Sequence, residues 1–172
     1  EFTHDSFYVG EDGPTHQPVE HIMSLRLIPN LNVYRPADAK ETAISMECIL
    51  RDTSTPSVIL LSRQGLPILD CDISQVKEGV RKGGYIVEDC EGEPEIIIIA
   101  TGSEVSLGIE VSSRLIDLNC RVVSVPCWEK YLLIPEDLRN NIIPSDKGIR
   151  ISIEAGATLG WERLTGDNGL NI

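Results

Sequence analysis

Short apolar segments that resemble buried strands alternate along this chain with segments that resemble helices. Ser57–Ser62 and Glu95–Ala100 contain uninterrupted apolar runs of strand length, and a helix-like segment adjoins each of them. Strands buried on both faces are typical of parallel sheets, in which helices connect successive strands. The chain is therefore predicted to be an α/β protein with two three-layer αβα units and mainly parallel sheets.

The first unit is predicted at residues 1–67. Its expected elements are a helix from Pro18 to a point before Pro29, a strand at 31–34, a helix from Asp38 to about Arg51, and a strand at 57–62. Asp38 and Glu41 have the spacing of a capping box. Strand, helix and strand in this order predict a parallel βαβ unit, and ligands gather where such strands end.

Residues 64–84 show no sustained periodicity and carry glycines, a proline and scattered charges. They are interpreted as an inter-domain linker, placed at 68–84, before a second unit at 85–172. The expected elements there are strands at 95–100, 121–125 and 149–154, helices after Thr101 and at 135–143, and a helix that opens over 155–161. A complete doubly wound sheet normally has more strands than these.

Composition limits the possible partners. The formal net charge is −12 and the sequence pI is about 4.6, so phosphate-rich partners such as nucleic acid or an anionic membrane surface would be repelled. The longest apolar run, Ile96–Ala100, is too short to cross a bilayer, and no signal peptide is recognised. An odd cysteine count of 5, without a CxxC pair, predicts reduced thiols and a cytoplasmic setting.

The opening stretch, residues 3–18, places histidines and carboxylates between turn-forming glycines and prolines. One interpretation is an active-site loop in which His4, Asp12 and His16 contact a hydroxylated substrate, because imidazole can donate to a hydroxyl or move a proton near neutral pH. The other is a solvated loop whose histidines cap turns. A metal site is disfavoured, since His16 and His21 are five positions apart and would not share a helix face.

Two further positions have alternative interpretations. Arg63 directly follows an apolar strand and either binds a phosphate or carboxylate or forms a salt bridge with one of the many acidic residues. Thr101-Gly102-Ser103 lies at a predicted turn from a strand into a helix. These residues either cap the helix together with Glu104 or bind a phosphate through the first amides of the helix. Capping is favoured, because the Walker lysine and the GxGxxG pattern are missing. Trp128 and Trp161 are expected to be packing anchors.

Several segments, in the same order along the chain, resemble the transketolase family. They are Thr3-His4-Asp5-Ser6, Gly10-Glu11-Asp12-Gly13-Pro14-Thr15-His16-Gln17-Pro18, Arg35-Pro36-Ala37-Asp38, Leu61-Ser62-Arg63-Gln64-Gly65-Leu66-Pro67, Ala100-Thr101-Gly102-Ser103-Glu104-Val105, and Ser152-Ile153-Glu154-Ala155-Gly156 with Gly160-Trp161. The resemblance covers nearly the whole chain: the second half of a pyrimidine-binding domain and most of a C-terminal domain. Both units would then be incomplete relative to the family.

The resemblance implies an enzyme of the pentose phosphate pathway and Calvin cycle that moves a two-carbon ketol unit from a ketose phosphate to an aldose phosphate. In family terms His16 is catalytic and bonds the donor's hydroxyls, Asp12 contacts the acceptor's 2-hydroxyl, and His4 and Arg63 hold the sugar phosphate. The intact enzyme would use thiamine diphosphate with Mg²⁺ or Ca²⁺ and would be a homodimer in the cytoplasm, or alternatively in a plastid.

The departures from the family shape this expectation. The diphosphate-binding domain with its metal motif is absent from this sequence, so no cofactor is expected on this chain alone, which would be inactive. Phe7-Tyr8 replaces a pair that usually ends in glycine. A dihydroxyacetone synthase fragment stays open as an alternative, whereas deoxyxylulose-phosphate synthase is disfavoured by Asp12 and Arg63-Gln64. A stand-alone, non-catalytic module that pairs with a separate partner chain is the remaining hypothesis.

Overall fold

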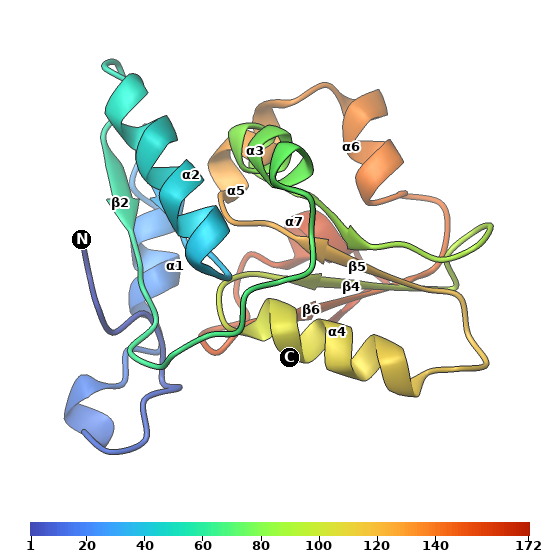
Figure 1. Cartoon of the computed structure of the whole chain (residues 1–172), viewed down its shortest axis with the longest axis horizontal. Coiled ribbons are helices and arrows are strands. Elements are labelled where there is room, and N and C mark those ends of the chain that lie inside the picture. Colours follow the sequence, from blue (N-terminus) through green and yellow to red (C-terminus); the bar gives the residue numbers. More distant parts are fainter.

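The computed structural model describes residues 1–172 and shows two α/β units packed against each other (Figure 1). The first unit has a two-stranded parallel sheet with one helix on each face. Its elements are the 3₁₀ helix η1 (Pro14–His16), α1 (His21–Arg26), β1 (Asn32–Tyr34), α2 (Ala39–Arg51) and β2 (Ser57–Ile59).

The second unit has a five-stranded sheet in the order β3-β5-β4-β6-β7. Only β3 is antiparallel to its neighbour, so the prediction of mainly parallel sheets is confirmed. Helix α3 (Ile73–Lys82) connects the two units. The elements of the second unit are β3 (Tyr85–Glu88), β4 (Ile96–Ala100), α4 (Glu104–Arg114), β5 (Cys120–Ser124), α5 (Trp128–Leu133), α6 (Glu136–Ile142), β6 (Ile149–Ile153), α7 (Glu162–Thr165) and β7 (Leu170–Asn171).

Alternate side chains of β4 explain how this sheet is covered on both faces. Ile97 and Ile99 pack with Trp128 and Trp161 on the face that carries α5 and α7, while Ile98 packs toward α4 on the other face. All of these side chains are almost completely buried. A strand of consecutive isoleucines therefore lies at the centre of the sheet, as its apolar run predicts.

The segment interpreted as a linker contains helix α3, which the sequence prediction did not include. Asp72 caps its start by accepting from Ser74 N, and Gly83, at φ 88°, ends it in the left-handed region. The buried stripe of α3 is Val76, Gly79 and Val80, so one of its positions is a glycine. That glycine hides the helical periodicity because it contributes no apolar side chain.

Other boundaries also differ from the prediction. Strands β3 and β7 and helix α5 were not expected, and the first helix begins at His21 rather than Pro18. No helix opens over 155–161 as expected; the short α7 begins only at Glu162. The two tryptophans are packing anchors, as predicted, with ring centroids 4.5 Å apart in a T-shaped arrangement. No helix has the length and apolar character needed to pass through a bilayer.

Neither expected capping box forms in full. Asp38 accepts from Glu41 N at 2.8 Å, but the Glu41 carboxylate accepts from Ala37 N instead of returning to its own cap. At α4 the N-cap is Ser103, and its hydroxyl donates to the side chain of Glu104 rather than accepting from the helix. The capping interpretation of Thr101–Glu104 is therefore wrong, because these polar groups belong to a buried hydrogen-bond network.

Candidate functional site

The opening loop is fastened to the end of strand β2. Phe2 forms a parallel bridge to Leu60 with backbone hydrogen bonds of 3.0 and 2.8 Å. On the other side of the loop, Gln64 Nε2 donates to the carbonyl oxygen of Val9 at 2.8 Å. Figure 1 shows the resulting loop, with its short helix η1, at the lower left of the molecule and far from α6.

Local backbone geometry presents His16 on this loop. Pro14 occupies the start of η1, and Gly13 before it has φ 70°, a conformation that side-chain-bearing residues rarely adopt. The turn closes when His16 N donates to Gly13 O at 3.1 Å. Thr15 Oγ1 lies 2.9 Å from His16 Nδ1 and orients the ring. His16 is thus fixed at an exposed position rather than packed into the core.

The structure brings the four predicted site residues together: His4 and Arg63 approach the Asp12 carboxylate, and the ring of His16 lies beside that of His4. Asp12 Oδ2 lies 3.4 Å from His4 Nε2 and 3.9 Å from Arg63 Nε. The rings of His4 and His16 have centroids 5.6 Å apart and planes inclined by 51°. These residues are separated by up to 59 positions, from His4 to Arg63 (63 − 4), so the fold rather than local sequence assembles the cluster.

The chemistry of this cluster suits a polar, anionic ligand. The Arg63 side chain is 54% exposed, and its 3.9 Å approach to Asp12 is too long for a strong charge-assisted bond. An incoming phosphate can therefore take the guanidinium without breaking a tight ion pair. The imidazoles and the Asp12 carboxylate supply donors and acceptors for hydroxyl groups.

The two units of this fold match two adjoining domains of one family. The family model described as the transketolase-like TK C-terminal domain matches residues 83–172, and the one described as the transketolase pyrimidine-binding domain matches residues 2–68.

The chain belongs to the transketolase family.

Individual relatives agree with this assignment. A transketolase from Staphylococcus aureus is 46% identical over 170 residues, which cover 98% of this chain and 26% of the relative. The solved transketolase from Leishmania mexicana superposes with a TM-score of 0.89 at 41% identity, covering 99% of this chain and 24% of that one. A Pichia stipitis transketolase in complex with sedoheptulose 7-phosphate gives 0.88 at 36%, with the same coverages. The chain spans about a quarter of the length of these relatives.

Behind the loop, this transketolase-family chain has a buried charge network that sequence reasoning missed. Arg35, which is fully buried, donates from Nε to Asp5 Oδ2 at 2.7 Å and from Nη1 to Thr101 O at 2.7 Å and to the Glu104 carboxylate. Gly102 makes room for it, since a Cβ there would lie 2.7 Å from Arg35 Cζ. The network ties the loop residue next to His4 to the second unit.

Burial and neighbouring charges have opposite effects on the pKa of Arg35. Burial alone would lower the pKa of its guanidinium, but the carboxylates of Glu104, Asp5 and Glu154 raise that pKa above its ordinary value. Arg35 is therefore held as a cation inside the protein. In the sequence, only the Arg35-Pro36-Ala37-Asp38 element pointed to Arg35, and it does not indicate which residues bind the guanidinium.

A second buried pair joins helix α1 to the sheet of the other unit. Arg26 donates to both oxygens of Glu154, at 2.7 and 2.9 Å, and its guanidinium lies 3.9 Å from the centroid of the Trp128 ring. Trp161 Nε1 donates to the same carboxylate at 2.9 Å. Burial would raise the pKa of Glu154, but Arg26 lowers it by charge and hydrogen bonding, with help from Arg35. Glu154 is thus ionised and shared by both units.

Proposed function

We propose that this chain forms the sugar-phosphate end of a transketolase active site. The intact protein would transfer a two-carbon ketol unit from a ketose phosphate to an aldose phosphate in the pentose phosphate pathway and the Calvin cycle. The observation that carries the proposal is the convergence of His4 and Arg63 on Asp12, at 3.4 and 3.9 Å, beside the ring of His16. The sedoheptulose 7-phosphate complex of the Pichia stipitis relative supports the choice of substrate class.

Each residue of the cluster has a role in this proposal. Arg63 and His4 hold the phosphate group, which suits a guanidinium and an imidazole at the rim of the loop. Asp12 accepts a hydrogen bond from the acceptor's 2-hydroxyl. His16 is the catalytic residue, which bonds the donor's hydroxyls and holds a proton near the reacting carbons. Local cations explain how a chain of net charge −12 binds an anionic substrate.

We propose that the residues of this chain do not by themselves hold thiamine diphosphate and its metal ion. No group of three or more His, Cys, Asp or Glu side chains is arranged to hold a metal ion. We place the cofactor, with Mg²⁺ or Ca²⁺, on parts of the intact protein outside this sequence, because the chain spans only about a quarter of the length of its relatives. The chain on its own is then inactive.

We also propose a domain division for this chain, and an oligomeric state and a compartment for the intact enzyme. The chain divides into a partial pyrimidine-binding domain at 1–67, a connecting segment at 68–84 that includes α3, and a C-terminal domain at 85–172. The matches of the two family models to residues 2–68 and 83–172 support this division. The intact enzyme is a homodimer in the cytoplasm, or in a plastid, with sugar phosphates as ligands and with neither nucleic acid nor membrane as partner.

The deciding experiment assays ketol transfer from sedoheptulose 7-phosphate to an aldose phosphate. The full-length protein that contains this sequence should be active, and the 172-residue chain should not be. Arg63→Gln and Asp12→Ala should each reduce kcat/KM in the full-length protein, while Arg51→Gln, an exposed arginine on α2, should not. Transfer at the wild-type rate by both site variants would contradict the proposed roles of Arg63 and Asp12.

Two alternatives have distinct outcomes in related assays. A dihydroxyacetone synthase would use formaldehyde as acceptor in preference to an aldose phosphate. A non-catalytic module that pairs with a separate chain would show no ketol transfer by itself, even as the full-length product of its own reading frame. Calorimetry of the 172-residue chain with thiamine diphosphate and Mg²⁺ should show no saturable binding, and one site per chain would contradict the placement of the cofactor.

A further inference from the structure

A small cavity of about 160 Å³ lies in the second unit where α6, the loop after it, β6 and α7 meet. It is in a different part of the fold from the opening loop and shares no residue with the Asp12 cluster. Three arginines line it, one from each of three elements: Arg139 on α6, Arg150 on β6 and Arg163 on α7.

These arginines have no carboxylate partner. None of them has an Asp or Glu oxygen within 4.0 Å, although Glu136 also lines the cavity. Every other arginine in the chain has such a partner. In a chain with 27 acidic and 15 basic residues, a shortage of carboxylates cannot explain why the unpaired arginines gather in one place.

Local structure holds two of the guanidiniums in position. Arg139 Nη1 donates to the carbonyl oxygen of Leu132 at 3.3 Å. Arg150 lies against Gly166, where a Cβ would come within 2.7 Å of Arg150 Nη2, so any larger residue there would displace the guanidinium. Gly166 also has φ 71°, which favours glycine. The site is therefore partly formed before any ligand arrives.

We propose that this cavity is a second anion site, which binds the phosphate group of a small phosphorylated molecule. Guanidinium groups from three elements can surround a tetrahedral oxyanion and donate to several of its oxygens at once. Asn140 and Ser145 add neutral donors at the same rim, and Tyr131 and Leu164 form an apolar wall. The volume accommodates a phosphate group with a few further atoms.

The test is an NMR titration of the 172-residue chain with inorganic phosphate at constant ionic strength. All samples carry Arg63→Gln, which removes the proposed phosphate contact in the opening loop, so that the two sites are distinguished. The backbone amide signals of Arg163 and Gly166 should shift in a saturable way. Loss of one guanidinium, in Arg150→Gln or Arg163→Gln, should weaken the affinity by at least about tenfold. Arg150→Lys, which keeps the positive charge but loses the paired N–H donors of the guanidinium, should weaken the affinity less.

Arg114→Gln is the matched control, because this arginine is exposed on α4 and pairs with Glu110. It should leave the affinity unchanged. A response without saturation, or equal affinities in the Arg150, Arg163 and Arg114 variants, would overturn the proposal. Malonate, a dicarboxylate with planar carboxyl groups, serves as the competitor, and tighter binding of malonate than of phosphate would overturn the assignment to a phosphate group. Thermal melting of each variant verifies that it is folded.

Discussion

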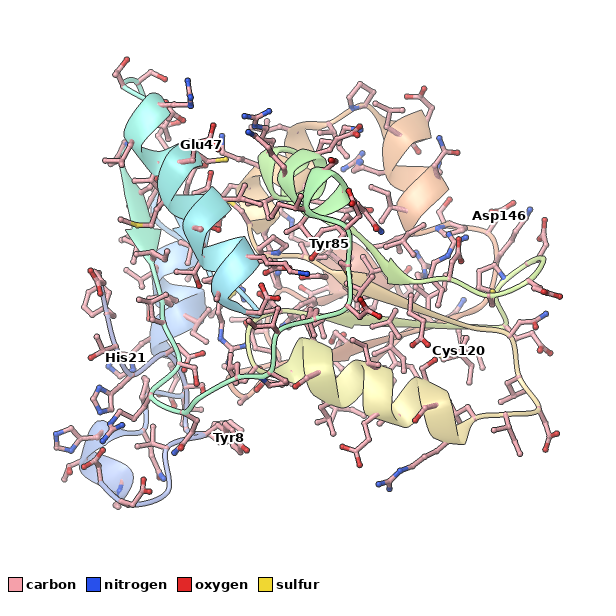
Figure 2. All side chains as sticks on the ribbon, viewed as in Figure 1. Tyr8, His21, Glu47, Tyr85, Cys120 and Asp146 are labelled. Atoms are coloured by element: carbon pink, nitrogen blue, oxygen red, sulfur yellow. The ribbon has the colours of Figure 1, made fainter.

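Tyr85 Oη donates a hydrogen bond of 2.9 Å to Glu41 Oε1, across the junction between strand β3 and helix α2. Ser124 Oγ donates to the same oxygen at 2.7 Å, and Ala37 N donates to the other at 2.7 Å. Glu41 is fully buried and has no cationic partner. Figure 2 shows Tyr85 at this junction. The carboxyl group of Glu41 is therefore satisfied by neutral donors alone.

The first prediction concerns pH. Burial raises the pKa of Glu41 to about 7, against the opposing effect of its three hydrogen bonds, and Asp38 nearby adds to the rise. Since the folded pKa lies above the unfolded value, the folded state binds the extra proton between about pH 4.5 and 7. This contribution to stability is complete below that window and is lost as the pH rises through it. Its size is on the order of 3 kcal/mol.

Urea unfolding of wild type and Glu41→Gln at pH 5 and pH 8 checks this. At pH 5 the variant should be slightly less stable, because its amide must turn its oxygen toward Ala37 N and its nitrogen toward the hydroxyls of Tyr85 and Ser124, which then accept instead of donating. By pH 8 the difference should shrink or reverse, since the wild type then carries a buried charge. A difference that stays constant across this range would show that Glu41 does not titrate there.

The second prediction concerns the buried Arg35. Arg35→Ala leaves Asp5 and Glu104 buried without their cation, and a broken buried pair of this kind costs about 3–5 kcal/mol. The control is Arg114→Ala, which removes an exposed pair on α4 and should cost under about 1 kcal/mol. Chemical denaturation of both variants at neutral pH measures the contrast. Equal losses would mean that the Arg35 network does not stabilise the fold.

The third prediction rests on the crowding of Gly79 against Tyr85. A Cβ at position 79 would lie 2.3 Å from Tyr85 Cγ, so Gly79→Ala should destabilise the protein by about 1–3 kcal/mol despite the better helix propensity of alanine. Gly65→Ala is the comparison, since nothing lies within 4 Å of its Cβ position. Thermal unfolding should separate the two, with the melting temperature lowered only for the residue 79 variant.

The fourth prediction concerns the proposed substrate contact. In the full-length protein, Arg63→Gln should raise KM for sugar phosphates by about 10- to 100-fold, the loss expected for a hydrogen bond to a charged group. The effect on kcat should be smaller, because Arg63 would grip the phosphate rather than the reacting carbons. Steady-state kinetics with phosphorylated and unphosphorylated acceptors checks this. Equal effects on both acceptors would argue against a phosphate contact.

The parts of the fold that the sequence predicts best are those with continuous local patterns. The isoleucine run at 96–100 predicts β4, and the segment from Asp38 to Arg51 predicts α2. Helix α3 was missed because Gly79 interrupts its apolar stripe. Strand β3 was missed because it directly follows that unrecognised helix and, as an antiparallel edge strand, does not belong to a βαβ pattern. Local periodicity carries no information about such positions.

The candidate site, like the fold, was only partly predictable from the sequence. Residue types alone left two interpretations of His4, Asp12 and His16, and only the fold brings Arg63 to within 3.9 Å of the same carboxylate. The Arg35 and Arg26 networks join residues 30, 69 and 128 positions apart, so no local motif could pair them. The catalytic and binding roles of the four cluster residues remain predictions.

The largest apolar cluster of this chain contains side chains from both of its units. Tyr34, Ile44 and Ile59 of the first unit pack in it with Val80 of the connecting helix α3 and with Tyr85 and Val105 of the second unit. Separating the units would expose all of these side chains to water at once, at a cost of roughly 25 cal/mol for each square ångström uncovered. The two units should therefore melt as one cooperative body, and cleavage between them should leave neither half able to fold alone.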